Sequence, residues 1–168
     1  MTCNSSFSVE CITFEAAPVH VAAAYQNLNR DMNPAFVHVF LDKLERYARK
    51  PDRALFLAKY QKNIIAFATI IDSAPVPDTL SVDQATLLSG CSCGTGLMVL
   101  PEYRKKGIAS LLVKQWEEWS LKNELPGIWV VTKEMGDWYR KHFNYSYVAC
   151  SERGGVKKTI LQKQFVTD

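Results

Sequence analysis

The chain has 168 residues, a length that favours a single domain over residues 1–168 with a sizeable hydrophobic core. Hydrophobic residues make up 48% and charged residues 22%, as in ordinary globular proteins, and a net charge of +3 does not indicate a nucleic-acid partner. Five cysteines at irregular spacing favour a reducing compartment over a disulfide framework. Because no signal peptide is recognisable and no apolar stretch approaches the roughly 18 to 20 residues of a membrane helix, we expect a cytoplasmic protein without a membrane partner.

The first part of the chain predicts one strand, two helices and two further strands. Residues 7–15 alternate in the manner of a strand, and a helix is expected from Pro18 to Arg30. Residues 34–50 carry apolar side chains at helical spacing and predict a second helix. The continuous apolar runs 54–60 and 64–71 predict strands of a sheet that is covered on both faces.

The middle of the chain predicts a loop and an extended segment rich in glycine. Residues 72–83 contain two prolines and predict a loop. Residues 85–100 predict extended structure, in which Gly90, Gly94 and Gly96 indicate a bulge or the close approach of a ligand to the backbone.

The last part of the chain predicts a helix from Lys106 to Asn123, a buried strand at 128–132, a short helix at 134–143 and a closing hairpin around Gly154. The complete order is strand, two helices, three strands, helix, strand, helix and two strands, or β-α-α-β-β-β-α-β-α-β-β. It predicts an α/β (α+β) domain in which a mixed central sheet carries helices on both faces.

The segment between the third strand pattern and the long helix has the features of a phosphate site. The amino end of a helix presents unpaired amides and a positive dipole. Gly107 lets an anion approach, Ala109 keeps the first turn small, and three consecutive cations precede the glycine. These cations are Arg104, Lys105 and Lys106. Read alone, the segment predicts either a phosphate-bearing ligand or a solvated basic turn.

The sequence LMVLPEYRKKGIASLLV closely resembles the acyl-CoA signature of the GNAT superfamily of N-acetyltransferases, and the predicted order of elements matches that fold over nearly the whole chain. The matching positions are Leu97, Val99, Pro101, Tyr103, Arg104, Gly107 and Ala109. The resemblance implies acetyl-CoA as co-substrate, with its pyrophosphate on the loop and helix start and its pantetheine arm along the preceding strand. The implied cofactor residues are Leu97, Met98, Val99, Arg104, Lys105, Lys106, Gly107, Ile108, Ala109, Ser110 and, after the next strand, Thr132.

The resemblance also implies the catalytic groups. A tyrosine on the helix after the next strand protonates the CoA thiolate in this family, and Tyr139 in GDWYRKHFNY is the candidate. Counting back from Asn144 and Tyr145 without a gap places Arg140 at that position instead, so both registers stay open. Glu134 is the candidate general base, ahead of Asp72 and Glu15, since no acid lies between Asp83 and Glu102.

The remaining reactive residues predict structural roles. Cys91 and Cys93 alternate along one strand face and are expected to be buried thiols, and neither they nor the scattered histidines form a metal motif, so we expect no metal. The histidines are His20, His38 and His142.

The sequence therefore predicts an acetyl-CoA-dependent N-acetyltransferase that acts on a primary amine by direct attack in a ternary complex. The acceptor is a small-molecule or peptide amine, toward which Asp31 is a candidate attracting charge, and a homodimer stays open. Two alternatives also stay open: a non-catalytic acyl-CoA-binding module of the same fold, and a basic protein-interaction surface.

Overall fold

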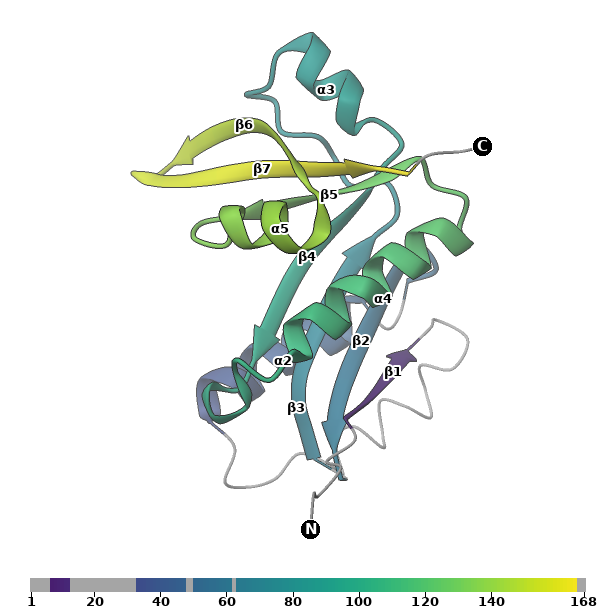
Figure 1. The fold of residues 1–168 in the computed structure, drawn as a ribbon, viewed down its shortest axis with the longest axis vertical. Coiled ribbons are helices and arrows are strands. Elements are labelled where there is room, and N and C mark those ends of the chain that lie inside the picture. The colour runs from purple at the N-terminus through teal and green to yellow at the C-terminus, as the bar shows by residue number, and fades with distance from the viewer. Residues whose placement is uncertain (1–6, 13–32, 48–49, 62, 166–168) are drawn as a thin grey trace. The chain divides into compact units, whose positions relative to one another are not determined.

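The computed structural model describes residues 7–12, 33–47, 50–61 and 63–165 (Figure 1). Its seven strands form a sheet in the order β1-β2-β3-β4-β5-β7-β6. By their contacts, the residues divide into two compact units: unit 1 comprises 1–70 with 96–115, and unit 2 comprises 71–95 with 116–168. The expectation of a single domain over the whole chain stays a prediction.

The elements follow in this order along the chain: β1 (Ser8–Ile12), α2 (Pro34–Tyr47), β2 (Arg53–Tyr60), β3 (Asn63–Ile71), α3 (Val82–Leu88), β4 (Ser92–Val99), the short 3₁₀ helix η1 (Pro101–Tyr103), α4 (Ile108–Lys122), β5 (Gly127–Thr132), α5 (Gly136–Phe143), β6 (Ser146–Arg153) and β7 (Val156–Gln164). The predicted helix from Pro18 to Arg30 lies outside the described residues.

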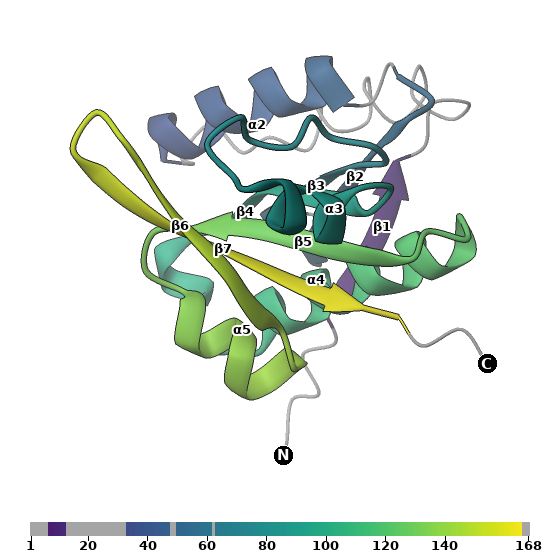
Figure 2. The same ribbon diagram turned by 90° about the horizontal axis from the view of Figure 1, so that it is seen from above.

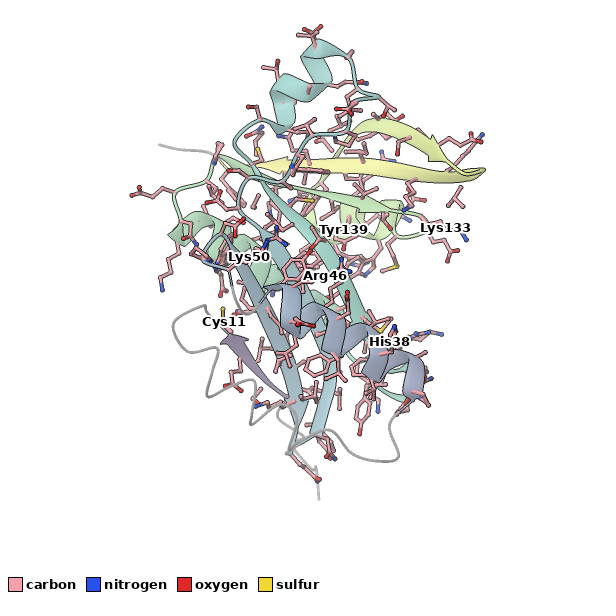
Figure 3. The ribbon with its side chains drawn as sticks, turned by 180° about the vertical axis from the view of Figure 1, so that it is seen from behind. Cys11, His38, Arg46, Lys50, Lys133 and Tyr139 are labelled. Atoms are coloured by element: carbon pink, nitrogen blue, oxygen red, sulfur yellow. The ribbon has the colours of Figure 1, made fainter. Side chains whose placement is uncertain are left out.

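Unit 1 contains strands β1, β2 and β3 and the end of β4. Strand β1 pairs with β2 in antiparallel register, from Ser8 opposite Lys59 to Ile12 opposite Leu55. Helix α2 and the first part of α4 lie on opposite faces of these strands, as Figures 1 and 3 show together. Both faces of β2 and β3 are therefore covered, which explains their continuous apolar sequences.

Helix α2 packs on the sheet of unit 1 through an aromatic contact. Its buried residues recur at helical spacing, as the sequence predicted. The rings of Phe36 and Phe40 lie 5.4 and 5.7 Å from the ring of Phe67 on β3. This contact holds α2 against the strands, and Figure 3 shows His38 and Arg46 along the same helix.

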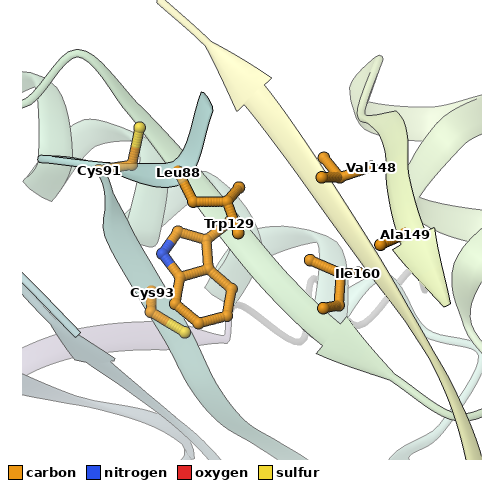
Figure 4. Packing of buried hydrophobic residues seen from close by; sticks show 7 residues of the cluster. All are labelled: Leu88, Cys91, Cys93, Trp129, Val148, Ala149 and Ile160. Carbon is orange, nitrogen blue, oxygen red and sulfur yellow. The ribbon is translucent and has the colours of Figure 1, made fainter. Parts of the chain in front are cut away.

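In unit 2, strand β5 pairs in parallel with the start of β4 and in antiparallel register with β7, which pairs with β6 (Figure 2). A cluster of seven buried residues covers one face of these strands (Figure 4). The cluster comprises Leu88, Cys91, Cys93, Trp129, Val148, Ala149 and Ile160. Helix α5 lies on the other face, where Gly136 approaches Leu161, since Ile160 and Leu161 point to opposite faces.

The predicted ends of the last helix and of the closing hairpin are confirmed. Asn144 ends α5 in the left-handed conformation with a φ of 58°. Gly154 and Gly155, with φ values of 61° and 75°, form the turn between β6 and β7.

The structure corrects the prediction for residues 85–100, which was extended structure throughout. Helix α3 occupies Val82–Leu88, and strand β4 begins only at Ser92. The Ser81 hydroxyl accepts a hydrogen bond from the Gln84 amide, and the Gln84 side chain accepts one from the Ser81 amide. This capping box satisfies amides at the start of the helix, and its Ser-x-x-Gln spacing was visible in the sequence.

With that correction, the predicted α+β class with a mixed sheet and helices on both faces is confirmed. Within the part of the chain that the structure describes, no helix is long and apolar enough to cross a membrane.

Candidate active site

The loop between β4 and α4 is held against the sheet of unit 1 by backbone hydrogen bonds. The Leu100 amide donates to the Ile65 carbonyl at 2.9 Å, which anchors the end of β4 to β3. The amides of Tyr103 and Arg104 then donate to Leu100 and Pro101 and form the single turn η1. This turn directs the following residues across the end of the strands toward the start of α4.

The backbone beyond η1 leaves the start of α4 open on one side. Lys105 and Gly107 have φ values of 60° and 80°, and the Gly107 carbonyl accepts the first helical bond of α4, from Leu111. The amides of Ile108, Ala109 and Ser110 therefore have no partner within the helix. No atom lies within 4 Å of the position that a Cβ on Gly107 would occupy, so this side of the loop is open. Unpaired amides beside open space at a positive helix end can bind a phosphate group.

The three predicted cations lie on this loop and are all exposed, but their side chains differ in their contacts. The Arg104 Nε donates to the Val99 carbonyl at 3.1 Å, so this guanidinium folds back over the end of β4. The Lys106 ammonium lies 5.2 Å from the centre of the Tyr103 ring. A cavity of about 470 Å³ adjoins the loop and is lined by Phe7, Tyr60, Glu102, Tyr103 and Lys106.

The predicted pantetheine segment, Leu97 to Val99, is half-buried on β4. The parallel ladder between β4 and β5 comprises the pairs Ser92–Ile128, Cys93–Trp129 and Gly94–Val130 among the described residues. Strand β4 runs on to Val99 beyond the last of these pairs. Of the three glycines at which the sequence predicted a bulge or the close approach of a ligand, Gly94 and Gly96 lie in β4. Gly90 lies before it, between α3 and β4.

Each of the two glycines of β4 has a close neighbour where a side chain would lie. In unit 2, a Cβ on Gly94 would lie 2.8 Å from the Trp116 ring of α4. In unit 1, a Cβ on Gly96 would lie 2.8 Å from the Thr69 hydroxyl and 3.4 Å from the Lys43 side chain of α2. Neither position has room for a side chain without a shift of its neighbour, and the predicted bulge stays a prediction.

Tyr139, the predicted acid, lies in unit 2 with only 4% of its surface exposed. Its ring lies 5.3 Å from that of Tyr145 and also contacts the rings of Trp138 and Phe143. Burial raises the pKa of the Tyr139 hydroxyl well above its ordinary value. Arg140, the residue that the other register places at this position, is instead exposed and pairs with Asp137 at 3.5 Å.

Thr132 and Glu134 also lie in unit 2, between β5 and α5. The Thr132 hydroxyl accepts a hydrogen bond from the Met135 amide at 3.0 Å and so stabilises the turn before α5. Because the hydroxyl oxygen is the acceptor in this bond, the hydroxyl proton can still be donated to a ligand. The Glu134 carboxylate is exposed and lies 3.6 Å from the Lys133 ammonium. Of the less favoured bases, Asp72 accepts a hydrogen bond from the Ser73 hydroxyl, and Glu15 lies outside the described residues.

The cysteines and histidines have the structural roles that the sequence predicted, as far as they are described. Cys91 and Cys93 belong to the same buried cluster, and burial raises the pKa of the Cys93 thiol to about 12. His38 is exposed on α2, and the His142 ring lies 6.1 Å from that of Trp138. His20 and Asp31 lie outside the described residues. Within the described ranges, no three His, Cys, Asp or Glu residues form a group that could hold a metal ion.

One residue near the predicted cofactor segment was missed by the sequence reasoning. Lys43 reaches from α2 to the backbone of Gly96, next to Leu97. The only local signal is its position four residues before Tyr47, over whose ring its ammonium lies at 5.1 Å. The contact with β4 joins residues far apart in the chain, and the sequence alone does not show it.

The similarity of this fold to solved structures extends over most of the chain. An acyl-CoA N-acyltransferase from Pseudomonas aeruginosa superposes with a TM-score of 0.64 at 9% identity, over 94% of this chain and 99% of that one. An IAA acetyltransferase from Bacillus cereus gives a TM-score of 0.53 at 11% identity, over 95% and 100%. Aminoglycoside N-acetyltransferase AAC(6')-Iy in complex with CoA gives 0.54 at 16% identity, over 80% and 85%. Because all three sequence identities are low, the similarity shows that the fold is shared and nothing more.

The sequence comparison identifies the family. No curated protein matches the chain. The sequence model of the acetyltransferase (GNAT) family, by contrast, matches residues 21–145, a range that includes the phosphate loop and Tyr139. The chain therefore belongs to the acetyltransferase (GNAT) family, a family of acetyl-CoA-dependent N-acetyltransferases.

Proposed function

We propose that this protein transfers the acetyl group of acetyl-CoA to a primary amine of a small molecule or peptide, by direct attack in a ternary complex. The observation that carries the proposal is the loop before α4. Its open Gly107 and the unpaired amides of Ile108 to Ser110 offer donors to the CoA pyrophosphate, with exposed cations beside them. The backbone of Leu97 to Val99 then pairs with the pantetheine arm.

In the proposed reaction, the amine nitrogen attacks the thioester carbonyl carbon, the new C–N bond forms and the C–S bond breaks. The leaving CoA thiolate receives a proton from the Tyr139 hydroxyl, and the proton lost by the amine passes to Glu134 and on to solvent. Solvent restores the tyrosine proton, so one amine proton is exchanged for one thiol proton overall. The Tyr139 hydroxyl carries a proton at neutral pH and can donate it, but the pKa raised by burial makes it a weaker acid than an exposed tyrosine.

A second candidate is a non-catalytic acyl-CoA-binding protein of the same fold. The exposed position of Glu134, with its carboxylate paired to Lys133, favours this alternative, because a catalytic base is ordinarily shielded from competing solvent contacts. Under this alternative the loop binds acetyl-CoA, but no amine is acetylated.

Thermal unfolding with and without acetyl-CoA tests the cofactor site. A ligand at about 100 times its dissociation constant stabilises the folded state by about 2.7 kcal/mol, so the unfolding temperature of the parent should rise by several degrees. Gly107→Glu places a carboxylate in the open space over the loop and should abolish this rise, because it repels and displaces the pyrophosphate.

Gly155→Glu is the matched control, because Gly155 also has a positive φ of 75° and no atom within 4 Å of an added Cβ. This variant carries the same backbone strain at the β6–β7 turn and should keep the full stabilisation by acetyl-CoA. A parent protein whose unfolding temperature does not change at millimolar acetyl-CoA would overturn the proposal. If acetyl-CoA binds and a broad amine screen releases no free CoA, the binding-protein alternative holds.

A further inference from the structure

Lys43 places a positive charge against strand β4 immediately before the predicted pantetheine segment. Its side chain leaves α2 beside the buried residues Phe40 and Leu44 and is itself half-buried. The Lys43 Cε and Nζ lie 3.4 and 3.7 Å from the position that a Cβ on Gly96 would occupy. The ammonium therefore lies over the β4 backbone within unit 1.

The absence of a side chain at residue 96 makes room for this lysine. A Cβ there would lie 2.8 Å from the hydroxyl of Thr69, a residue of β3 that is fully buried. It would also touch the Lys43 Cε at 3.4 Å, so an alanine would force the Thr69 hydroxyl to move and would pack against the lysine stem. Gly96, Thr69 and Lys43 thus form a small polar site on the face of the sheet that α2 covers.

The charge of Lys43 is not neutralised by a carboxylate of the described residues. The neighbouring acid on α2, Asp42, pairs with Arg46 at 2.9 Å, and none of the described ion pairs includes Lys43. The Tyr47 ring supplies a cation–π contact at 5.1 Å. A half-buried ammonium still gains most from an anion with which it can form a charge-assisted hydrogen bond.

The position along β4 indicates which anion this is. Residues 97 to 99 follow Gly96 directly and are the segment proposed to pair with the pantetheine arm, so Lys43 lies at the acyl end of that arm. The CoA phosphates belong to the other end of the segment, at the loop beyond Pro101. The anion at Lys43 is therefore part of the molecule that receives the acyl group.

We propose that the acceptor is an amine that also carries a carboxylate, as in an amino acid or the end of a peptide, and that Lys43 binds this carboxylate. The inference rests on the proposed function, since it names the class of acceptor for the same reaction. Lys43 positions the acceptor and takes no proton from it.

Matched pairs of acceptors test this inference. The kcat/KM of the full-length enzyme is measured for L-amino acids and for the corresponding amino-acid amides, and the ratio of the two gives the preference for the carboxylate. Lys43→Met keeps the length of the side chain and removes the charge. It should lower the ratio by about 10- to 100-fold, the effect of one hydrogen bond between charged groups.

Lys50→Met is the matched control, because Lys50 is an exposed lysine close to the end of α2. It should leave the ratio unchanged. The rise in unfolding temperature that acetyl-CoA causes should be the same in the parent and in both variants, which shows that Lys43→Met is folded and binds its cofactor.

Two results would overturn the inference. One is a ratio that Lys43→Met leaves unchanged; if kcat/KM falls equally with acids and amides, Lys43 acts in the chemical step instead. The other is a parent that acetylates no carboxylate-bearing amine although acetyl-CoA stabilises it. If the parent acetylated only neutral or cationic amines, this inference would be wrong and the proposed function would still hold. If acetyl-CoA did not bind, both would be wrong.

Discussion

Two neighbouring tyrosines in unit 2 have buried hydroxyl groups, and we propose a catalytic role for only one of them. Tyr139 and Tyr145 have ring centres 5.3 Å apart, and burial raises the pKa of both hydroxyls. The Tyr145 hydroxyl is buried and has no hydrogen-bond partner in the described structure, so it contributes an unsatisfied polar group to the interior. Tyr139 is the one that we propose as the acid.

Tyr139→Phe should lower kcat by about 100-fold or more, because the departing thiolate loses its proton donor. Tyr145→Phe should leave kcat unchanged, and it should not lower the free energy of unfolding, since it removes the unsatisfied hydroxyl. Steady-state kinetics with thiol detection, together with urea unfolding, measure both effects. If the kcat of both variants equalled that of the parent, Tyr139 would have only a packing role.

At the scale of the single residue, sequence reasoning worked where the signal was local. Gly107 and Ala109 belong to a motif of consecutive residues, and their backbone geometry follows from neighbours in the chain. The burial of Tyr139 and the exposure of Arg140 needed the structure, because only tertiary packing decides which side chain is buried. Lys43 was missed for the same reason, since its contact at Gly96 joins residues distant in sequence.

Helix α3 shows how a short element is stabilised by its first turn and by one tertiary contact. The Ser81 hydroxyl and the Gln84 side chain cap the helix, and the Gln84 Nε2 also donates to the Val148 carbonyl at 3.1 Å. Leu88 then anchors the end of α3 in the buried cluster of unit 2. The sequence predicted extended structure here because the seven residues of α3 contain too few apolar side chains for a helical period to be visible.

Ser81→Ala should lower the free energy of unfolding by about 1 kcal/mol and speed amide hydrogen exchange in residues 82–88, because the Gln84 amide loses its acceptor. Ser89→Ala is the control at the other end of the helix, where the backbone amide and not the hydroxyl makes the described cap bond. It should change neither quantity. The same exchange rates in the parent and in Ser81→Ala would show that packing alone holds α3.

The stability of the whole molecule should depend on pH in the alkaline range. The Cys93 thiol has a pKa raised by burial from 9.0 to about 12, so the folded state keeps this proton when the unfolded chain has lost it. The free energy of unfolding should therefore fall as the pH rises above about 9, by about 1.4 kcal/mol per pH unit for each such group. Tyr139 and Tyr145 act in the same direction once the pH exceeds their ordinary value of 10.0.

Urea unfolding between pH 8 and about pH 10.5 measures this dependence. In Cys93→Ala the free energy of unfolding should fall less steeply above pH 9, because the buried thiol is absent. This holds even if the substitution lowers the free energy of unfolding at pH 8. Cys150→Ala removes an exposed thiol and should leave the slope as in the parent. An unchanged slope in Cys93→Ala would mean that the thiol is not held in its neutral form by the fold.

The sequence by itself determined the family, the position of the glycine-containing loop before α4 and nearly all of the described elements. Hydrophobic periodicity, prolines, glycines and the acyl-CoA motif are properties of neighbouring residues, and their physical consequences are felt locally. Tertiary structure decided the close contacts at Gly94 and at Gly96, the burial of Tyr139 and the contact of Lys43 with β4. Each of these arises where segments distant in the chain meet and exclude water, and no local pattern carries that information.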